Sequence, residues 1–161
     1  MADMLVKLYE LPQASGLAAR LRRTGIEIRR ALAPEKRLVS DWVRESFGLA
    51  WAGECEVSFS RSPVSCFIAC RRGRILGFAC HDATCRNFFG PAGVAPEARG
   101  QGIGKALLLE CLRAMASQGY AYAIIGGAGS PGFYRKAVGA VPIRGSSPGI
   151  YRGLLRSPRG A

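Results

Sequence analysis

The sequence predicts one domain of mixed α/β structure whose strands are mostly antiparallel. Residues 64–73 and 74–82 are apolar segments on either side of a turn at Arg72-Gly73, a pattern typical of a hairpin. Residues 102–118 are amphipathic and lie between two further apolar segments, which predicts a strand–helix–strand crossover. The chain has 161 residues, 48% apolar and 21% charged, so it can bury a core.

Ahead of the hairpin, the pattern changes from an extension to a strand and then to helices. Residues 1–24 are interpreted as an N-terminal extension with one short helix, and residues 25–161 as the single domain. Apolar and charged residues then alternate from Ile26, which favours a strand. Apolar side chains at helical spacing follow, between Pro34 and Gly48. The elements expected here are a strand at residues 26–33, a helix at 34–48 and a helical segment at 49–60.

Beyond the hairpin, glycine and proline mark the element boundaries. The expected strand at residues 87–94 contains Gly90, Pro91 and Gly93, which usually indicate a bulge, an edge or a close approach to the backbone. Ser130 is a candidate N-cap for a short helix, since proline follows it. The remaining expected elements are the helix at 102–118, a buried strand at 120–127, a helix at 131–138, and short strands at 140–144 and 149–155.

The charge is strongly positive and unevenly distributed. There are 23 basic and 11 acidic residues, which gives a net charge of +12. Residues 57–161 hold 14 bases and three acids, and therefore nearly all of the excess. A strongly basic segment of this kind could bind nucleic acid, an anionic surface or a phosphorylated small ligand, and composition alone does not distinguish these partners. Arginine enrichment can also reflect genome base composition.

The six cysteines do not have the spacing of a metal site. There is no C-x-x-C pair and His81 is the single histidine, whereas zinc sites usually carry paired short spacings. Cys66 and Cys70 lie in an apolar run, where buried thiols are common. We therefore expect reduced core thiols and no metal.

The richest motif joins the strand ending at Val94 to the long helix. It places Arg99, three glycines at alternate positions and Lys105 where the helix begins. Glycines let the backbone approach a ligand closely, and a helix N-terminus offers unpaired N–H groups and partial positive charge. Together they predict a cradle for a phosphate or pyrophosphate. The motif fits neither G-x-x-x-x-G-K-[ST] nor G-x-G-x-x-G, so it is neither a P-loop nor a dinucleotide fingerprint.

Two segments resemble the GNAT N-acetyltransferase superfamily. Arg99-x-x-Gly102-x-Gly104 is similar to the family's acetyl-CoA signature, and the segment from Phe133 to Gly139 is similar to its second signature. The two lie in register, about 30 residues apart, with a buried strand between them. The resemblance covers roughly residues 25–155, and its specific motifs lie within 88–140.

The resemblance implies a twisted sheet with helices on both faces and a V-shaped splay between the strand ending at Val94 and the strand at residues 120–126. The pantetheine arm of acetyl-CoA would lie in the splay and the pyrophosphate on the amides of residues 99–105. The residues that the resemblance implies for binding the cofactor are Ala92, Gly93, Val94, Arg99, Gly100, Gln101, Gly102, Ile103, Gly104, Lys105, Ser130 and Tyr134.

Tyr134 is the candidate general acid. Amine attack on acetyl-CoA expels a thiolate, and a phenol beside the sulfur can donate a proton to it. The same tyrosine often does so in similar enzymes. The alternative is a tyrosine whose hydroxyl is merely satisfied at the pocket edge. This chain departs from the family at Gly127, where many relatives carry an asparagine that holds the pantetheine; Ser130 or backbone amides could substitute.

The general base has several candidates, because an alkylammonium must lose a proton before it attacks. Glu54 and Glu56 lie on the second helical segment, and His81-Asp82 ends a strand. The first two helices shape the acceptor pocket in the family, so we expect Trp51 and Glu54 to line it. We select Glu54 as the catalytic partner of Tyr134.

The expected function is transfer of an acetyl group from acetyl-CoA to a primary amine, by direct attack in a ternary complex. The alternatives are an inactive CoA-binding GNAT module and a basic nucleic-acid-binding protein, which lacks its usual motifs here. The sequence shows neither an apolar run of 18 residues nor a signal-peptide pattern, so we expect a cytoplasmic protein without membrane association. The partner is an amine acceptor, small or peptidic, and a homodimer is frequent among similar proteins.

Overall fold

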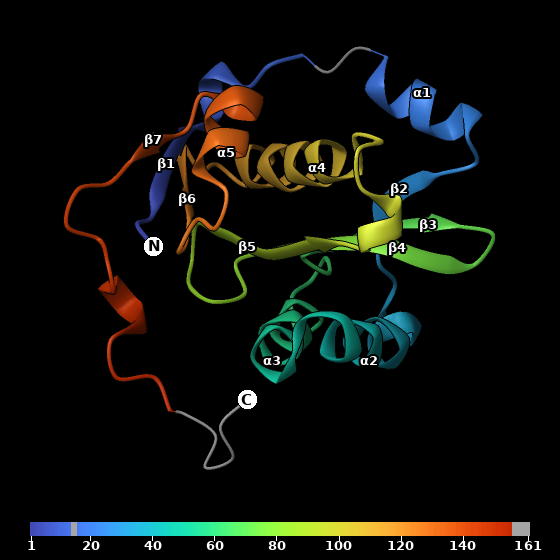
Figure 1. The fold of residues 1–161 in the computed structure, drawn as a ribbon, viewed down its shortest axis with the longest axis horizontal. Helices are drawn as coiled ribbons and strands as arrows, with labels where there is room; N and C mark the ends of the chain where they lie inside the picture. Colours follow the sequence, from blue (N-terminus) through green and yellow to red (C-terminus); the bar gives the residue numbers. More distant parts are fainter. Residues whose placement is uncertain (14–15, 156–161) are drawn as a thin grey trace.

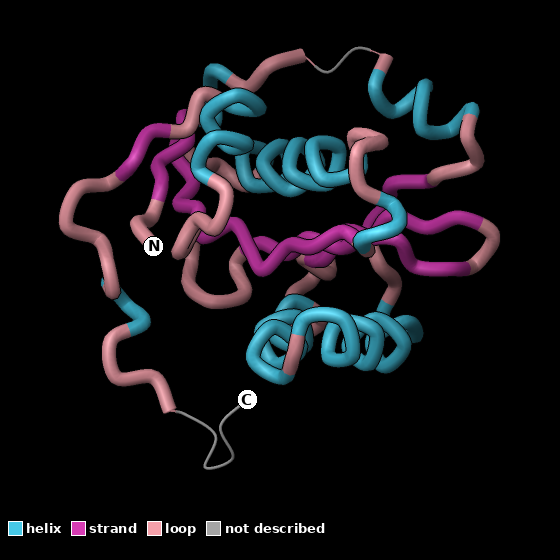
Figure 2. Tube along the Cα trace, in the orientation of Figure 1, coloured by secondary structure: helices cyan, strands magenta, loops and turns pink. Residues whose placement is uncertain are grey.

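A computed structural model of the chain describes residues 1–13 and 16–155 (Figure 1). One open sheet lies between two layers of helices (Figure 2). The strands are β1 Met4–Lys7, β2 Glu27–Arg30, β3 Cys66–Arg71, β4 Arg74–His81, β5 Phe88–Val94, β6 Tyr122–Ile125 and β7 Val141–Pro142. The α-helices are α1 Leu17–Arg23, α2 Lys36–Phe47, α3 Leu49–Ser58, α4 Ile103–Ser117 and α5 Pro131–Val138. The 3₁₀ helices are η1 Leu8–Glu10, η2 Ala33–Glu35, η3 Pro96–Ala98 and η4 Gly149–Tyr151.

The sheet has the order β2-β3-β4-β5-β6-β1-β7 and is antiparallel except between β5 and β6. The parallel β5–β6 pairing is short: Phe88 faces Ile124 and Phe89 faces Ile125. The rest of β5, as far as Val94, has no strand partner on that side among the described residues. The sheet therefore splays open there, as the resemblance implies. The strand directions confirm the predicted mixed, mostly antiparallel sheet.

Helices cover both faces of the sheet, as expected (Figure 1). Helix α4 packs its apolar stripe against one face, together with α1 and α5, and its Leu107, Leu112 and Met115 are almost fully buried. Helices α2 and α3 lie on the other face and bury Val43 and Cys55 in a second core cluster. Among the described residues, no helix combines the length and apolar character needed to cross a bilayer.

The N-terminal segment is more than an extension. The expected short helix is present as α1, but Met4–Lys7 forms β1, which lies inside the sheet between β6 and β7. Met4 and Val6 are almost fully buried against the α4 side of the core. A strand of four residues is too short for its apolar–polar alternation to stand out in the sequence. Its partners on β6 also lie more than 110 residues away, so no local pattern indicates the pairing.

The last expected strand, residues 149–155, is wrong. Residues Gly149–Tyr151 form η4, held by a hydrogen bond from the Tyr151 N–H to the Pro148 carbonyl oxygen at 3.1 Å. Gly149 has a φ of +57°, a left-handed conformation that turns the chain instead of extending it. This turn brings Tyr151 back toward the sheet.

Candidate active site

A trough follows the splay beside β5 and consists of three adjoining cavities. The cradle cavity, about 760 Å³, lies at the N-terminus of α4 and includes Arg99, Gly102 and Lys105. A middle cavity of about 140 Å³ shares Val94, Gly104 and Phe133 with it. The Glu54 cavity, about 390 Å³, shares Phe89, Ala92 and Tyr134 with the middle one. Ser130 lines both end cavities.

The backbone of the cradle has the conformation that its glycines allow. Gly100 and Gly102 have φ values of +78° and +89°, in the left-handed region that L side chains rarely adopt. The first bond of the helix runs from the Ala106 N–H to the Gly102 carbonyl oxygen at 3.0 Å, so the N–H groups just before Ala106 have no acceptor within the helix. These donors and the positive end of the α4 dipole suit an anion.

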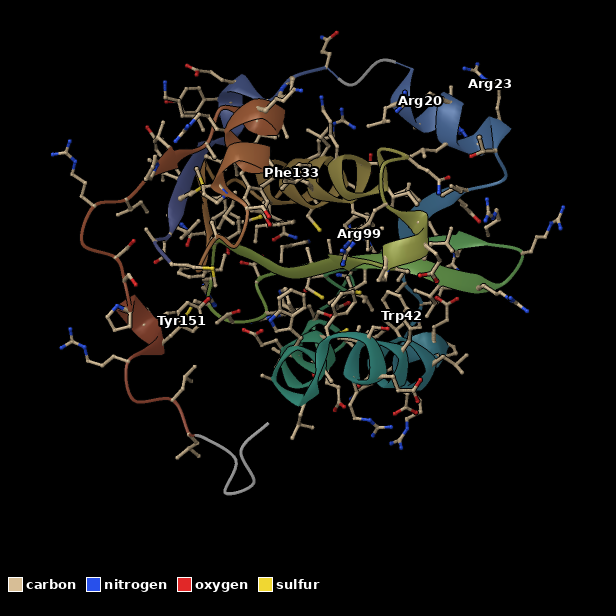
Figure 3. All side chains as sticks on the ribbon, in the orientation of Figure 1. Arg20, Arg23, Trp42, Arg99, Phe133 and Tyr151 are labelled. Carbon is tan, nitrogen blue, oxygen red and sulfur yellow. The ribbon has the colours of Figure 1, made fainter. Side chains whose placement is uncertain are left out.

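Cationic side chains surround these donors. Arg99, Lys105 and Lys136 line the cradle cavity. Arg20, on α1, adds a fourth cation, because its Nη2 atom lies 2.8 Å from where a Cβ on Gly102 would be (Figure 3). The sequence alone does not indicate Arg20, because its pattern marks residues 1–24 as an extension of the domain. Gln101 turns its amide to the Ala98 carbonyl oxygen at 3.3 Å instead of lining the cavity.

The missing side chain of Gly93 lets another group approach the backbone closely, but that group is the ring of Phe47 and not a ligand. A Cβ on Gly93 would lie 2.5 Å from the ring of Phe47 on α2. Phe47 in turn stacks on Trp51, with ring centroids 5.3 Å apart. The glycine that suggested room for a ligand therefore also serves the packing of α2 on β5. Ala92, Gly93 and Val94 line the middle cavity, where the resemblance places pantetheine.

Tyr134 stands where the middle cavity meets the Glu54 cavity. Its ring packs edge-on against Phe89 and Phe133, at centroid distances of 6.2 and 5.1 Å. Burial raises the pKa of its phenol above the ordinary value, so the hydroxyl keeps its proton at neutral pH. The described residues give this hydroxyl no hydrogen-bond partner, so it is free to donate into the trough.

The Glu54 cavity brings together the two residues that we expected around an acceptor. Trp51 and Glu54 both line it, from α3. The Thr84 hydroxyl donates a hydrogen bond of 2.5 Å to Glu54 Oε1, which leaves the other carboxylate oxygen for a ligand. Helix α3 therefore holds a carboxylate on the opposite side of the splay from Tyr134.

Residues 62–137 match the family model described as acetyltransferase (GNAT) domain. The chain carries a GNAT domain. The match includes β3, β4, β5, the cradle with the first signature, and the second signature as far as Ala137. No curated protein matches the chain in sequence.

Solved structures share the fold of this GNAT domain over 88% of the chain. They include the glucosamine N-acetyltransferase region of a fungal multi-domain GH3 β-N-acetylglucosaminidase, with a TM-score of 0.72, 14% identity and 19% of that chain covered. GCN5-related N-acetyltransferases from Sphaerobacter thermophilus and Kribbella flavida have TM-scores of 0.64 and 0.58, with 23% and 18% identity. The chain spans 48% and 53% of those two proteins, about half of their length.

The other candidate bases of the GNAT domain lie away from the trough. Glu56 accepts a hydrogen bond from the Ser40 hydroxyl at 2.8 Å and so faces α2. His81 is fully buried and stacks on Phe67, and its Nδ1 contacts Asp82 at 3.0 Å. Burial lowers the pKa of His81, and neither His81 nor Glu56 lines a cavity of the trough. Glu54 is the candidate base that the fold places there.

Sequence reasoning missed Tyr151 and the reason for Gly127. Tyr151 lines the Glu54 cavity from η4, and its hydroxyl fills the space that a Cβ on Gly126 would need. Gly127, which replaces the asparagine common in the family, donates its N–H to Asp3 Oδ1 at 2.7 Å. The double glycine therefore admits Tyr151 and binds the N-terminal segment. Its sequence signal was the pair of glycines directly after a buried strand.

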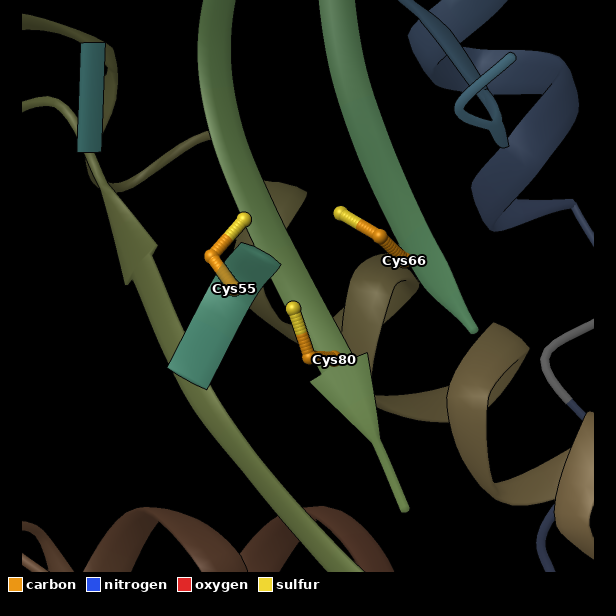
Figure 4. A group of neighbouring side chains, drawn as sticks. All are labelled: Cys55, Cys66 and Cys80. Atoms are coloured by element: carbon orange, nitrogen blue, oxygen red, sulfur yellow. The ribbon is translucent and has the colours of Figure 1, made fainter. Parts of the chain in front are cut away.

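Three buried thiols form a separate group on the α2–α3 side of the sheet (Figure 4). The sulfur atoms of Cys55, Cys66 and Cys80 lie within 4.8 Å of one another, and all three residues are fully buried. Such sulfurs could ligate a thiophilic ion once deprotonated. Burial raises the pKa of Cys80, whereas side-chain hydrogen bonds with Cys66 and Cys80 lower the pKa of Cys55. Our expectation that the chain holds no metal stays a prediction.

Proposed function

We propose that the chain is an N-acetyltransferase that moves the acetyl group of acetyl-CoA to a primary amine. The observation that carries the proposal is the trough itself, with an anion cradle at one end and a cavity lined by both a proton donor and a carboxylate at the other. The phosphates of acetyl-CoA would bind the α4 amides, Arg99, Lys105 and Lys136. The acetyl end would then reach Tyr134.

The residues at the Glu54 cavity account for each proton. The Glu54 carboxylate takes one proton from the acceptor ammonium, directly or through a water molecule, and so frees the nitrogen lone pair. The nitrogen forms a bond to the acetyl carbon, and the carbon–sulfur bond breaks. Tyr134 donates its proton to the departing sulfur, and the second proton of the nitrogen restores Tyr134 through solvent. The products are an amide, CoA and one proton released from Glu54.

Binding and turnover test different parts of the proposal. Saturating acetyl-CoA should raise the melting temperature, since a ligand that binds the folded state stabilises it. An amine panel should then release CoA thiol from acetyl-CoA. No change in melting temperature would refute the cradle. A higher melting temperature without turnover of any amine would instead identify an inactive CoA-binding module.

Tyr134→Phe tests the general acid. We expect kcat to fall by about 10²-fold or more, since removal of a positioned proton donor typically costs 10²–10⁴-fold. The affinity for acetyl-CoA, measured by calorimetry, should hold because the ring packing on Phe89 is kept. Tyr122→Phe, an exposed tyrosine on β6, is the matched control. Full turnover by Tyr134→Phe would remove Tyr134 from the mechanism.

A further inference from the structure

The two ends of the trough have opposite electrostatic character. Arginine and lysine side chains surround the cradle cavity. Of the described residues that line the Glu54 cavity, Glu54 is the one with a charged side chain. The Met1 ammonium is directed to the exposed Ser147 hydroxyl at 3.2 Å. In a chain of net charge +12, the Glu54 cavity is thus a locally negative site.

A second carboxylate reinforces this field from behind the wall. Asp3 is buried and is held by the Gly127 N–H at 2.7 Å. Its Oδ2 atom lies 3.6 Å from where a Cβ on Gly149 would be, so it stands beside η4. Burial, and then the negative charges of Glu54 and Asp3, raise the pKa of Tyr151 to about 12. The negative charges of Glu54 and Asp3 are therefore both close enough to affect Tyr151, a residue of the cavity wall.

Apart from Thr84 and Ser130, the other side chains of the wall are apolar or aromatic. Trp51 stacks on Phe47, and Phe89 and Tyr134 pack edge-on at the inner end. Tyr151 lines the cavity from η4, and its hydroxyl packs against Gly126. A cavity of about 390 Å³ with such walls suits a small molecule with an apolar body.

We propose that the acceptor is a small primary amine with an apolar or aromatic body and no carboxylate near the amine. This inference rests on the proposed acetyl transfer and names its substrate class. The ammonium of the acceptor lies against Glu54, and its body lies between Trp51 and Tyr151. An α-amino acid would bring its own carboxylate into the field of Glu54 and Asp3, with no basic side chain in the described lining to pair it.

Matched amine pairs that differ in one carboxylate test the proposal. The probes are tryptamine against tryptophan and tyramine against tyrosine, each with acetyl-CoA and detection of released CoA. We expect kcat/KM to favour the carboxylate-free member at least tenfold in the two aromatic pairs. Equal or better use of the amino acids would overturn the proposal.

Asp3→Asn tests whether charge causes the discrimination. Asparagine keeps an oxygen for the Gly127 N–H but removes the charge, so the preference should narrow about threefold while turnover of tryptamine persists. Asp41→Asn, on the exposed side of α2, is the control and should leave the preference unchanged. An unchanged preference in Asp3→Asn would overturn the electrostatic argument.

A binding measurement separates this proposal from the failure of acetyl transfer. If acetyl-CoA binds but no probe is turned over, the proposed activity fails. The melting temperature of the CoA complex then decides the present inference. Tryptamine should raise it and tryptophan should not. The reverse order would refute the selectivity independently of catalysis.

Discussion

Gly93 shows how one residue can serve a packing role inside a functional motif. The ring of Phe47 occupies the space of a Cβ at this position, so α2 settles directly on β5. Phe47 then orients Trp51, which lines the Glu54 cavity. A substitution at Gly93 would therefore disturb both the core and the trough.

Gly93→Ala should destabilise the protein by ~2 kcal/mol, because a Cβ 2.5 Å from Phe47 overpacks the interface. Gly132→Ala is the control. Gly132 lies in α5 with nothing near its Cβ position, so alanine should be neutral or stabilising there. Urea unfolding measures both free energies, and equal stability of the two variants would contradict this account.

Whether a site residue could be predicted depended on how far along the chain it lies from the other residues of the site. Tyr134 and the cradle glycines could be predicted, because each lies in a short motif whose spacing indicates its chemistry. Glu54 could be chosen as the base, but the sequence offered Glu56 and His81 beside it. What distinguishes the three is burial and hydrogen bonding, which only the fold shows. Tyr151 and Arg20 could not be predicted, because the chain returns to the trough from η4 and α1 through contacts that no local pattern encodes.

Strand β1 is the element whose role the sequence concealed most. It pairs with β6 in register from Met4–Ile125 to Lys7–Tyr122, and it also pairs with β7. Its short alternation could not reveal these partners. By contrast, α2, α4 and the β3–β4 hairpin were predictable, because helical periodicity and the Arg72-Gly73 turn are local signals.

Met4→Ala should lower the free energy of unfolding by ~3 kcal/mol, as for other large-to-small changes in a core. The side chain is almost fully buried in the cluster that α4 forms with the sheet. Leu154→Ala, at a residue that is 64% exposed, should change stability little. If Met4→Ala matched Leu154→Ala in chemical denaturation, β1 would not be integral to the core.

At the cradle, the N–H groups at the N-terminus of α4 orient a bound phosphate, and the surrounding basic side chains add positive charge. Lys136→Gln should weaken acetyl-CoA binding about fivefold, because a partly exposed charge pair contributes on the order of 1 kcal/mol. Lys36→Gln, at the start of α2 on the other face, should have no effect. Calorimetry at low and high salt measures this, and the difference between the variants should shrink as salt screens the charges.

The stability of the whole molecule should depend on pH through His81. Burial lowers its folded-state pKa below the unfolded value of about 6.5. As pH falls through 6.5, the unfolded state binds a proton that folded His81 binds less readily. Stability is therefore lost toward acid, by at most ~1.4 kcal/mol per pH unit for one proton.

Thermal unfolding between pH 7.5 and 5.5 measures this slope in the wild type and in His81→Gln. The variant should be less sensitive to pH, whatever its absolute stability, because its amide does not titrate. An unchanged slope would show that other groups dominate. Asp82, which contacts His81 Nδ1 at 3.0 Å, opposes part of the burial effect and limits its size.

The aromatic cluster beside β5 also gives the molecule a built-in optical reporter. The chain has two tryptophans, Trp42 and Trp51, and both pack against Phe47 and Phe78. Trp51 is the one that lines the Glu54 cavity. In a Trp42→Phe background, the emission of the remaining indole would come from the cavity wall alone. Its quenching or blue shift could then follow occupancy of that cavity in real time, without any chemical turnover.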